Sequence, residues 1–214
     1  MKKILKGTLL IVLLPILLIS CEQMFTYSMF EWAQRDPSNL SEAQQISYAK
    51  SVLGSGDQQS MGDAYEAIKD NTDPEVQLLA SKLAVGASGI NEAVEQALSD
   101  FESGSTSSIG PYIDSLDQTM LDNAVKSMAD ATDDSSTASE VTSEEYLTTA
   151  VACLILSLPA DPGSTDIEAA VDDVQLAITN SNESKTGSDT FKAAYYLIQS
   201  GYDSADLESM LNYS

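Results

Sequence analysis

Apolar side chains recur along most of this chain at spacings of three and four residues, with short polar stretches between successive groups. This spacing places apolar residues on one face of an α-helix, whereas the strict alternation that predicts a β-strand is nearly absent. The pattern predicts helices close to residues 24–35, 41–53, 57–68, 73–85, 90–101, 111–128, 142–158, 165–178, 191–198 and 204–211. We therefore expect an all-α protein built of short helices.

Helix-capping residues precede several of these groups. Asp57 stands before one predicted helix, and Asp73-Pro74-Glu75 combines an Asp cap, a proline at the first helical position and an acid at the positive end of the helix dipole. The spacing of a capping box, in which a Ser or Thr side chain and a later Glu or Gln bond reciprocally to backbone N–H groups, occurs at Ser41 and Gln44, at Thr142 and Glu145, and at Thr165 and Glu168.

The segment from residue 142 to residue 158 is apolar nearly all round the predicted helix. A helix of this kind is normally buried, so we expect it to be the central element of the core. Residues 130–142 are acidic, rich in Ser and Thr and nearly free of apolar residues, and we expect a mobile acidic loop there. Residues 41–214 should then form a single all-helical domain, preceded by an N-terminal helix or tether at 21–40.

The junctions between the first predicted helices have a recurring composition. Asp36-Pro37, Gly56-Asp57 and Asp73-Pro74 resemble the junctions of tetratricopeptide repeats, and Asn91-Glu92-Ala93-Val94 is similar to the start of the second helix of such a repeat. The two Asp-Pro pairs lie 37 residues apart, and the period is lost beyond Phe101. The resemblance implies a helical-hairpin array, a tetratricopeptide-like α-solenoid; the alternative is an irregular helical bundle.

The first 20 residues have the character of an export signal. Three lysines precede an unbroken apolar stretch, Leu9–Ile19, which is shorter than the roughly 20 residues that a membrane-spanning helix needs. We predict a signal peptide at residues 1–20. Leu18-Ile19-Ser20-Cys21 resembles the lipobox of bacterial lipoproteins, which signal peptidase II cleaves. The resemblance implies that Cys21 begins the mature chain and carries a diacylglycerol that binds the protein to a membrane.

The charge of the chain limits the classes of partner that it can bind. Its 33 acidic and 10 basic side chains give a formal charge of −23, and removal of residues 1–20 takes away three lysines and leaves −26. Such a surface repels nucleic acid and anionic lipid, so we expect no nucleic-acid partner and a membrane attachment through the lipid alone. A protein partner should have a neutral or basic surface. Glu22 stands where enterobacterial lipoproteins retained in the inner membrane have Asp, and the resemblance therefore favours the outer membrane, on its periplasmic or surface face.

Candidate catalytic chemistry is sparse. The chain has no histidine, which excludes His-dependent nucleophilic or general-base catalysis and His metal ligands. Cys153 is the one thiol that remains after lipidation of Cys21, so we expect no intrachain disulfide, and its apolar neighbours predict a buried, inert side chain. We predict no catalytic, cofactor-binding or metal-binding residue, and no enzyme.

These features predict an envelope lipoprotein that acts as a non-enzymatic helical scaffold or accessory subunit in protein–protein interaction. The alternative function is that of a solute-binding accessory lipoprotein of a periplasmic transport system. That alternative requires an apolar cavity between helices with a volume of roughly several hundred Å³.

Overall fold

The computed structural model describes residues 37–54, 57–93, 96, 110–160 and 162–202. The chain divides into two units, residues 1–41 and residues 42–214. In the first unit the described residues include a short 3-10 helix, η1 (Pro37–Asn39). The predicted lipidation site Cys21 and the helices predicted at 24–35 and 204–211 lie outside the described residues.

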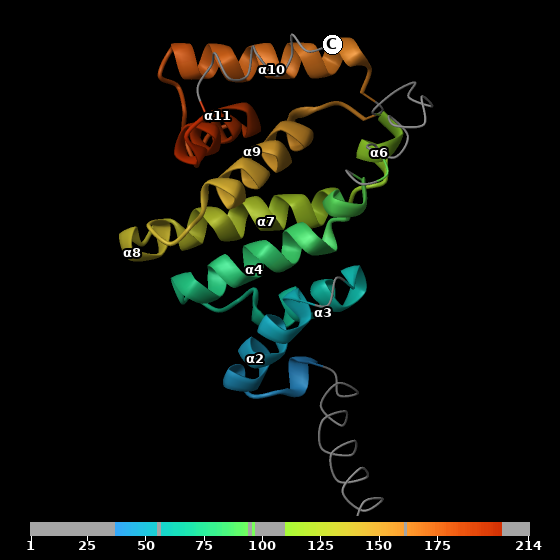
Figure 1. Ribbon diagram of the computed structural model, residues 1–214, viewed down its shortest axis with the longest axis vertical. Helices are drawn as coiled ribbons and strands as arrows, with labels where there is room; N and C mark the ends of the chain where they lie inside the picture. The colour runs from blue at the N-terminus through green and yellow to red at the C-terminus, as the bar shows by residue number, and fades with distance from the viewer. Residues whose placement is uncertain (1–36, 55–56, 94–95, 97–109, 161, 203–214) are drawn as a thin grey trace, which may run out of the picture. The chain divides into compact units, whose positions relative to one another are not determined.

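The described part of the second unit is helical and contains no strand, which confirms the predicted all-α class. Its helices, labelled in Figure 1, are α2 (Glu42–Leu53), α3 (Gln58–Ile68), α4 (Pro74–Ala87), α6 (Gly110–Asp114), α7 (Gln118–Ala131), α8 (Ser135–Ala138), α9 (Ser143–Ser157), α10 (Ser164–Thr179) and α11 (Asp189–Ser200). Residues 90–93 are helical as well.

Several of the predicted caps form as expected. The Asp57 carboxylate accepts a backbone N–H at the start of α3, and the Asp73 carboxylate does the same for α4, each at 2.9 Å. Thr142 and Glu145 make the reciprocal bonds of a capping box at α9. The Glu145 carboxylate accepts the Thr142 N–H at 2.8 Å, and the Thr142 hydroxyl accepts the Glu145 N–H at 3.3 Å. These bonds satisfy N–H groups that have no partner inside the helix.

Two helix starts differ from the prediction. Helix α10 begins one residue before Thr165, so Gly163 is its N-cap, and the Asp166 carboxylate accepts the Gly163 N–H at 2.8 Å. The single helix predicted at 111–128 is interrupted, because the Asp117 carboxylate caps a new helix, α7, by accepting two backbone N–H groups at 2.9 and 3.1 Å. At α7 the Asp117 carboxylate satisfies free N–H groups of the first turn, whereas at α10 the Asp166 carboxylate bonds the N–H of the N-cap residue itself.

The segment predicted as an acidic loop, residues 130–142, is partly helical. Its first two residues complete α7, and its centre forms α8. The Asp134 carboxylate caps α8 by accepting the backbone N–H groups of Ser136 and Thr137, at 3.0 and 3.1 Å. Thr137 and Val141 are buried. The segment is therefore not a loop throughout, because Asp134 caps a short helix. The acidic, Ser- and Thr-rich composition of the segment does not reveal this cap.

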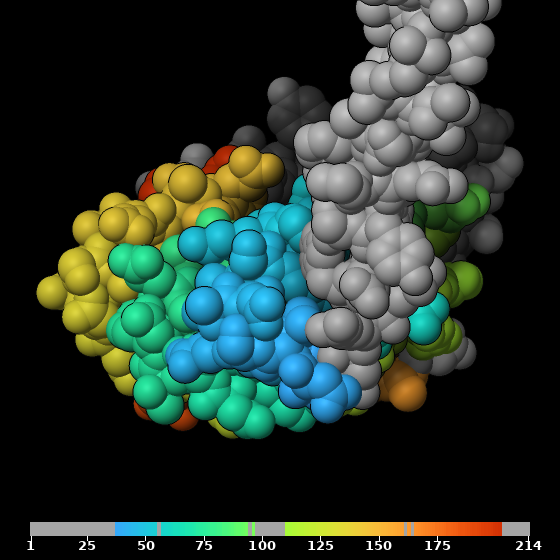
Figure 2. Space-filling model, turned by 90° about the horizontal axis from the view of Figure 1, so that it is seen from below, coloured from blue at the N-terminus to red at the C-terminus, as the bar shows by residue number. Residues whose placement is uncertain are grey.

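Packing within the second unit largely follows the order of the chain. Helix α2 packs on α3, α3 on α4, α4 on α7, α7 on α9, and α9 on α11, as Figure 1 shows. Helix α2 also contacts α4, and the two lie side by side on the surface seen in Figure 2. Helix α10 departs from this order, because α9 packs more extensively on α11 than on α10. This packing is consistent with both the predicted helical array and the alternative helical bundle.

Two groups of buried apolar residues form the core. The first lies mainly between α2, α3 and α4, and its largest members are Val52, Met61, Tyr65, Ile68, Val76, Leu79 and Leu83. The second lies mainly between α7, α9, α10 and α11, and includes Leu121, Val125, Met128, Tyr146, Cys153, Val174, Tyr196 and Leu197. Helix α4 contributes to both groups. Between them the buried Ser81 hydroxyl of α4 donates a hydrogen bond of 2.9 Å to the Ala124 carbonyl of α7.

Helix α4, and not α9, is the most buried helix of the described residues. Ten of its residues are buried, against five in α9. Gly86 allows α4 to approach α3 closely, because a Cβ atom at this position would overlap the sulfur of Met61. The prediction that α9 forms the centre of the core is therefore wrong. Within the described part of the chain, no helix covers all of its apolar surface, and Val151 is 39% exposed.

Candidate functional site

The apolar surface that α9 leaves uncovered opens into a hollow between α9, α10 and α11. The hollow has a volume of about 180 Å³, and it is lined by Leu147, Ala150, Val151, Leu154, Val171, Val174, Ala193 and Leu197. Every lining residue is apolar. We call this feature the apolar hollow.

The side chains of α9 at the apolar hollow follow a helical stripe. Leu147, Val151 and Leu154 are spaced four and three residues apart and therefore lie on one face. Leu147 and Leu154 are partly buried, whereas 39% of Val151 is exposed. The sequence signal for this surface was the apolar character of α9 on all sides; its interpretation as burial missed the exposed part.

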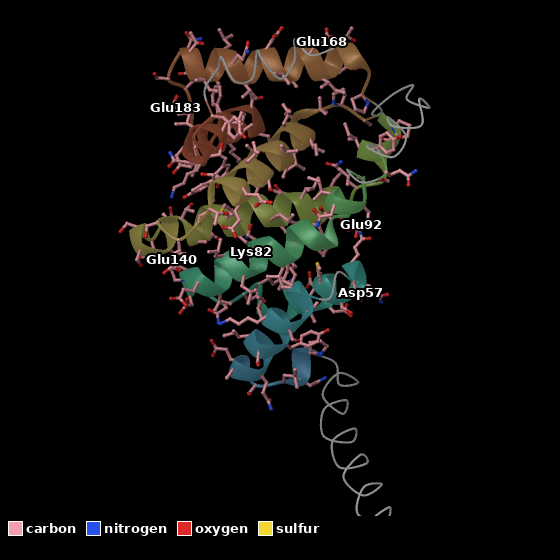
Figure 3. The ribbon with its side chains drawn as sticks, in the orientation of Figure 1. Asp57, Lys82, Glu92, Glu140, Glu168 and Glu183 are labelled. Atoms are coloured by element: carbon pink, nitrogen blue, oxygen red, sulfur yellow. The ribbon has the colours of Figure 1, made fainter. Side chains whose placement is uncertain are left out.

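Acidic side chains dominate the helices that form the apolar hollow. Helix α10 carries four acids, Asp166, Glu168, Asp172 and Asp173, all exposed, and no basic residue. Figure 3 labels Glu168 on this helix. Helix α11 has one lysine, Lys192, and its ammonium lies 2.9 Å from the Asp189 carboxylate. The apolar lining is therefore accompanied by a surplus of negative charge.

A second hollow, of about 420 Å³, has a mixed lining and lies between α4 and the start of α9. The Lys82 ammonium, labelled in Figure 3, lies 2.6 Å from the Glu145 carboxylate there and joins the two helices. Partial burial raises the pKa of Glu145, but the hydrogen bonds from Lys82 and from the Thr142 N–H, with the charge of Lys82, outweigh it and hold this pKa below its usual value. Glu145 therefore already takes part in a helix cap and in an ion pair.

Two carboxylates of the acidic segment, Asp133 and Asp134, also have structural partners. Asp134 caps α8, and hydrogen bonds from the Ser136 hydroxyl and the Thr137 N–H lower its pKa. Asp133 pairs with Lys185. Among the described residues, no three side chains of the types that ligate metals converge on one point.

Cys153 is fully buried and free, as its apolar neighbours predict. Burial raises its pKa to about 12, although the charge of Lys192 acts in the opposite direction. The folded protein brings Lys192 toward this thiol from a distant part of the chain, which the linear sequence does not reveal. Because the thiolate is the reactive form, this burial and raised pKa predict an unreactive Cys153 at neutral pH.

The chain matches no protein-family model, no curated protein and no solved structure. Within the part of the chain that the structure describes, none of the helices combines the length and the apolar character needed to cross a bilayer.

Proposed function

We propose that this chain is a lipid-anchored lipoprotein of the bacterial cell envelope whose helical array is a non-enzymatic scaffold or accessory subunit for other proteins. The observation that carries the proposal is the sequence Leu18-Ile19-Ser20-Cys21, which follows a basic start and an apolar stretch. Each buried acyl methylene contributes about 0.8 kcal/mol, so the two or more chains of a lipoprotein anchor hold a protein stably at a membrane.

The scaffold part of the proposal is supported by the fold and by the state of the side chains. Stacked helices present extended surfaces to partners. The chain has no histidine, and Cys153 is buried. Two carboxylates near the hollows, Glu145 and Asp189, are engaged in ion pairs.

The proposed partner is a protein with a neutral or basic surface, because a mature chain of charge −26 repels acidic surfaces and nucleic acid. The outer membrane is the favoured location, on its periplasmic or surface face, because Glu22 replaces the aspartate of the inner-membrane signal. The scaffold is preferred to a solute-binding role for two reasons. The apolar hollow, at about 180 Å³, is smaller than the roughly 300–1,000 Å³ of small-molecule sites, and the hollow of about 420 Å³ between α4 and α9 has a mixed lining that includes the Lys82–Glu145 ion pair.

Metabolic labelling with an alkyne analogue of palmitate tests the anchor. Wild-type chain should incorporate the label and sediment with membranes, whereas Cys21→Ala should lose the label and release a soluble, folded protein. Cys153→Ala is the matched control, since it removes the other cysteine and should leave labelling unchanged. An unlabelled wild-type chain, or mature-size Cys21→Ala that stays in the membrane fraction without a partner, would refute the anchor.

A further inference from the structure

We infer that the apolar hollow between α9, α10 and α11 is a docking site for a short amphipathic helix of a partner protein, with basic residues beside its apolar face. This inference rests on the proposed scaffold function and adds the chemistry of the partner. It starts from two observations. The apolar surface of the hollow is partly uncovered, and acidic side chains beside it (Glu144, Glu168 and Asp189) form what we call the negative rim.

The size of the hollow suits an apolar side chain. A buried apolar cavity of about 150 Å³ holds one benzene molecule, so the apolar hollow, at about 180 Å³, has room for one large side chain. The stripe of Leu147, Val151 and Leu154 lines the hollow over two turns of α9 and offers contact to residues one turn before or after the inserted one. Amphipathic helices bind apolar grooves in this way, through residues spaced three and four apart.

Helical spacing places an acid next to a lining residue on each of the three helices. Glu144 precedes Leu147 by three residues on α9, Glu168 precedes Val171 by three on α10, and Asp189 precedes Ala193 by four on α11. Residues at these spacings are neighbours on a helix surface. Together the three helices carry seven acids and one lysine. That lysine is paired with Asp189, and Glu145 is paired with Lys82 of α4, which leaves five acids outside these two ion pairs. Lysines or arginines beside the apolar face of a partner would complement this rim.

The same charges disfavour the other available occupants. The segment 203–214 of this chain contains three acids and no basic residue, so it would bring like charges to the rim. A second copy of the chain would bring an equally acidic face. Like charges placed together at an interface oppose association, and a basic helix meets no such penalty.

Fluorescence anisotropy with labelled synthetic peptides tests the inference. The probe is a short helical peptide with leucines spaced three and four residues apart and lysines elsewhere. One control has the same composition in scrambled order, and another has glutamate in place of lysine. The complete chain is used, in phosphatidylcholine nanodiscs when it carries lipid and in solution when it does not, so that a failure of the proposed anchor leaves this measurement intact.

The basic amphipathic peptide should bind at least about tenfold more tightly than either control. Val151→Asp should weaken its binding about tenfold even though it adds negative charge, because a carboxylate buried in an apolar contact is unfavourable. Leu176→Asp is the matched control: Leu176 is 58% exposed on α10 and does not line the hollow, so affinity should stay within about twofold. Glu168→Lys should weaken the basic peptide and strengthen the acidic one without touching the apolar lining.

Circular dichroism and a thermal melt establish that each variant is folded. Equal affinity for the scrambled peptide, or unchanged affinity in folded Val151→Asp, would overturn the inference and leave only non-specific charge attraction. Binding that appears only after the chain is shortened to end at Tyr202 would show that the chain's own end covers the hollow. A dimer of the wild-type chain that Val151→Asp dissociates would assign the hollow to a second copy; either result also overturns the basic partner.

Discussion

The Tyr196 side chain is fully buried in the core, and its hydroxyl has no hydrogen-bond partner among the residues that the structure describes. The neighbouring Tyr146 ring stacks against it, with centroids 6.2 Å apart, but the Tyr146 hydroxyl donates to the Ala138 carbonyl at 3.1 Å. The same substitution, Tyr to Phe, therefore removes an unsatisfied polar group at one position and a hydrogen bond at the other.

An unsatisfied buried polar group costs about 1–3 kcal/mol, whereas a hydrogen bond contributes about 0.5–1.5 kcal/mol. Removal of the oxygen leaves a small void that offsets part of the gain. We expect Tyr196→Phe to raise the free energy of unfolding by about 1 kcal/mol and Tyr146→Phe to lower it by about 1 kcal/mol. Urea titrations followed by circular dichroism measure both values.

The pH dependence gives a second readout. Burial raises the pKa of Tyr196, so the folded state retains its proton where the unfolded state loses it. This contribution to stability is fully present below about pH 10, the usual tyrosine pKa, and is lost as the pH rises further. The advantage of Tyr196→Phe should therefore grow above about pH 10. Destabilisation by Tyr196→Phe as large as that by Tyr146→Phe would refute the reasoning, because it would mean that the hydroxyl is satisfied.

Three further predictions test the packing and the charges. Glu145→Gln keeps an acceptor for the cap but loses the attraction to Lys82, so it should lower the free energy of unfolding by less than about 1 kcal/mol, and Glu145→Ala by about 1–2 kcal/mol. The Glu145 pKa is lower in the folded state than in the unfolded state. The difference in free energy of unfolding between wild type and Glu145→Gln should therefore be fully present above about pH 4.3 and be lost as the pH falls through the lowered pKa. A difference that persists in acid would contradict this prediction. Gly86→Ala should lower the free energy of unfolding by about 1 kcal/mol, because the added methyl group overpacks the contact with Met61. In a Met61→Ala background the methyl group has room, and the same substitution should raise the free energy of unfolding. Urea titrations measure both values, and destabilisation in both backgrounds would contradict the close packing of Gly86 on Met61. Cys153 should resist Ellman's reagent in native protein and react in denaturant; rapid native reaction would contradict its burial.

The helix starts were the most predictable part of the fold. Asp57, Asp73 and Thr142 each act within three residues of their own position, so the local sequence holds all the information that the cap needs. The failures have the same physical origin. Asp117 and Asp134 also cap helices, but they stand in segments whose composition suggests helix interior or loop.

The apolar hollow was not predictable from the sequence, although its signal is present there. A helix that is apolar all round indicates burial only when another element covers every side. Helix α9 packs mainly on α11 and α7, and α10 covers it only slightly. Which side of α9 stays open depends on contacts between segments distant in the sequence, and periodicity within one helix carries no information about them.

The first group of buried residues draws almost all its members from residues 42–87, with Ala124 as its only fully buried residue from later in the chain. Its contacts are consequently short in sequence separation, and contacts of this kind form quickly because little chain entropy is lost in making them. A chain exported with its N-terminus first would have these three helices outside before α7 or α9 has followed. If the chain is exported as proposed, this core would be able to assemble while the rest of the chain is still in transit, which would limit the time that its apolar faces are exposed to aggregation.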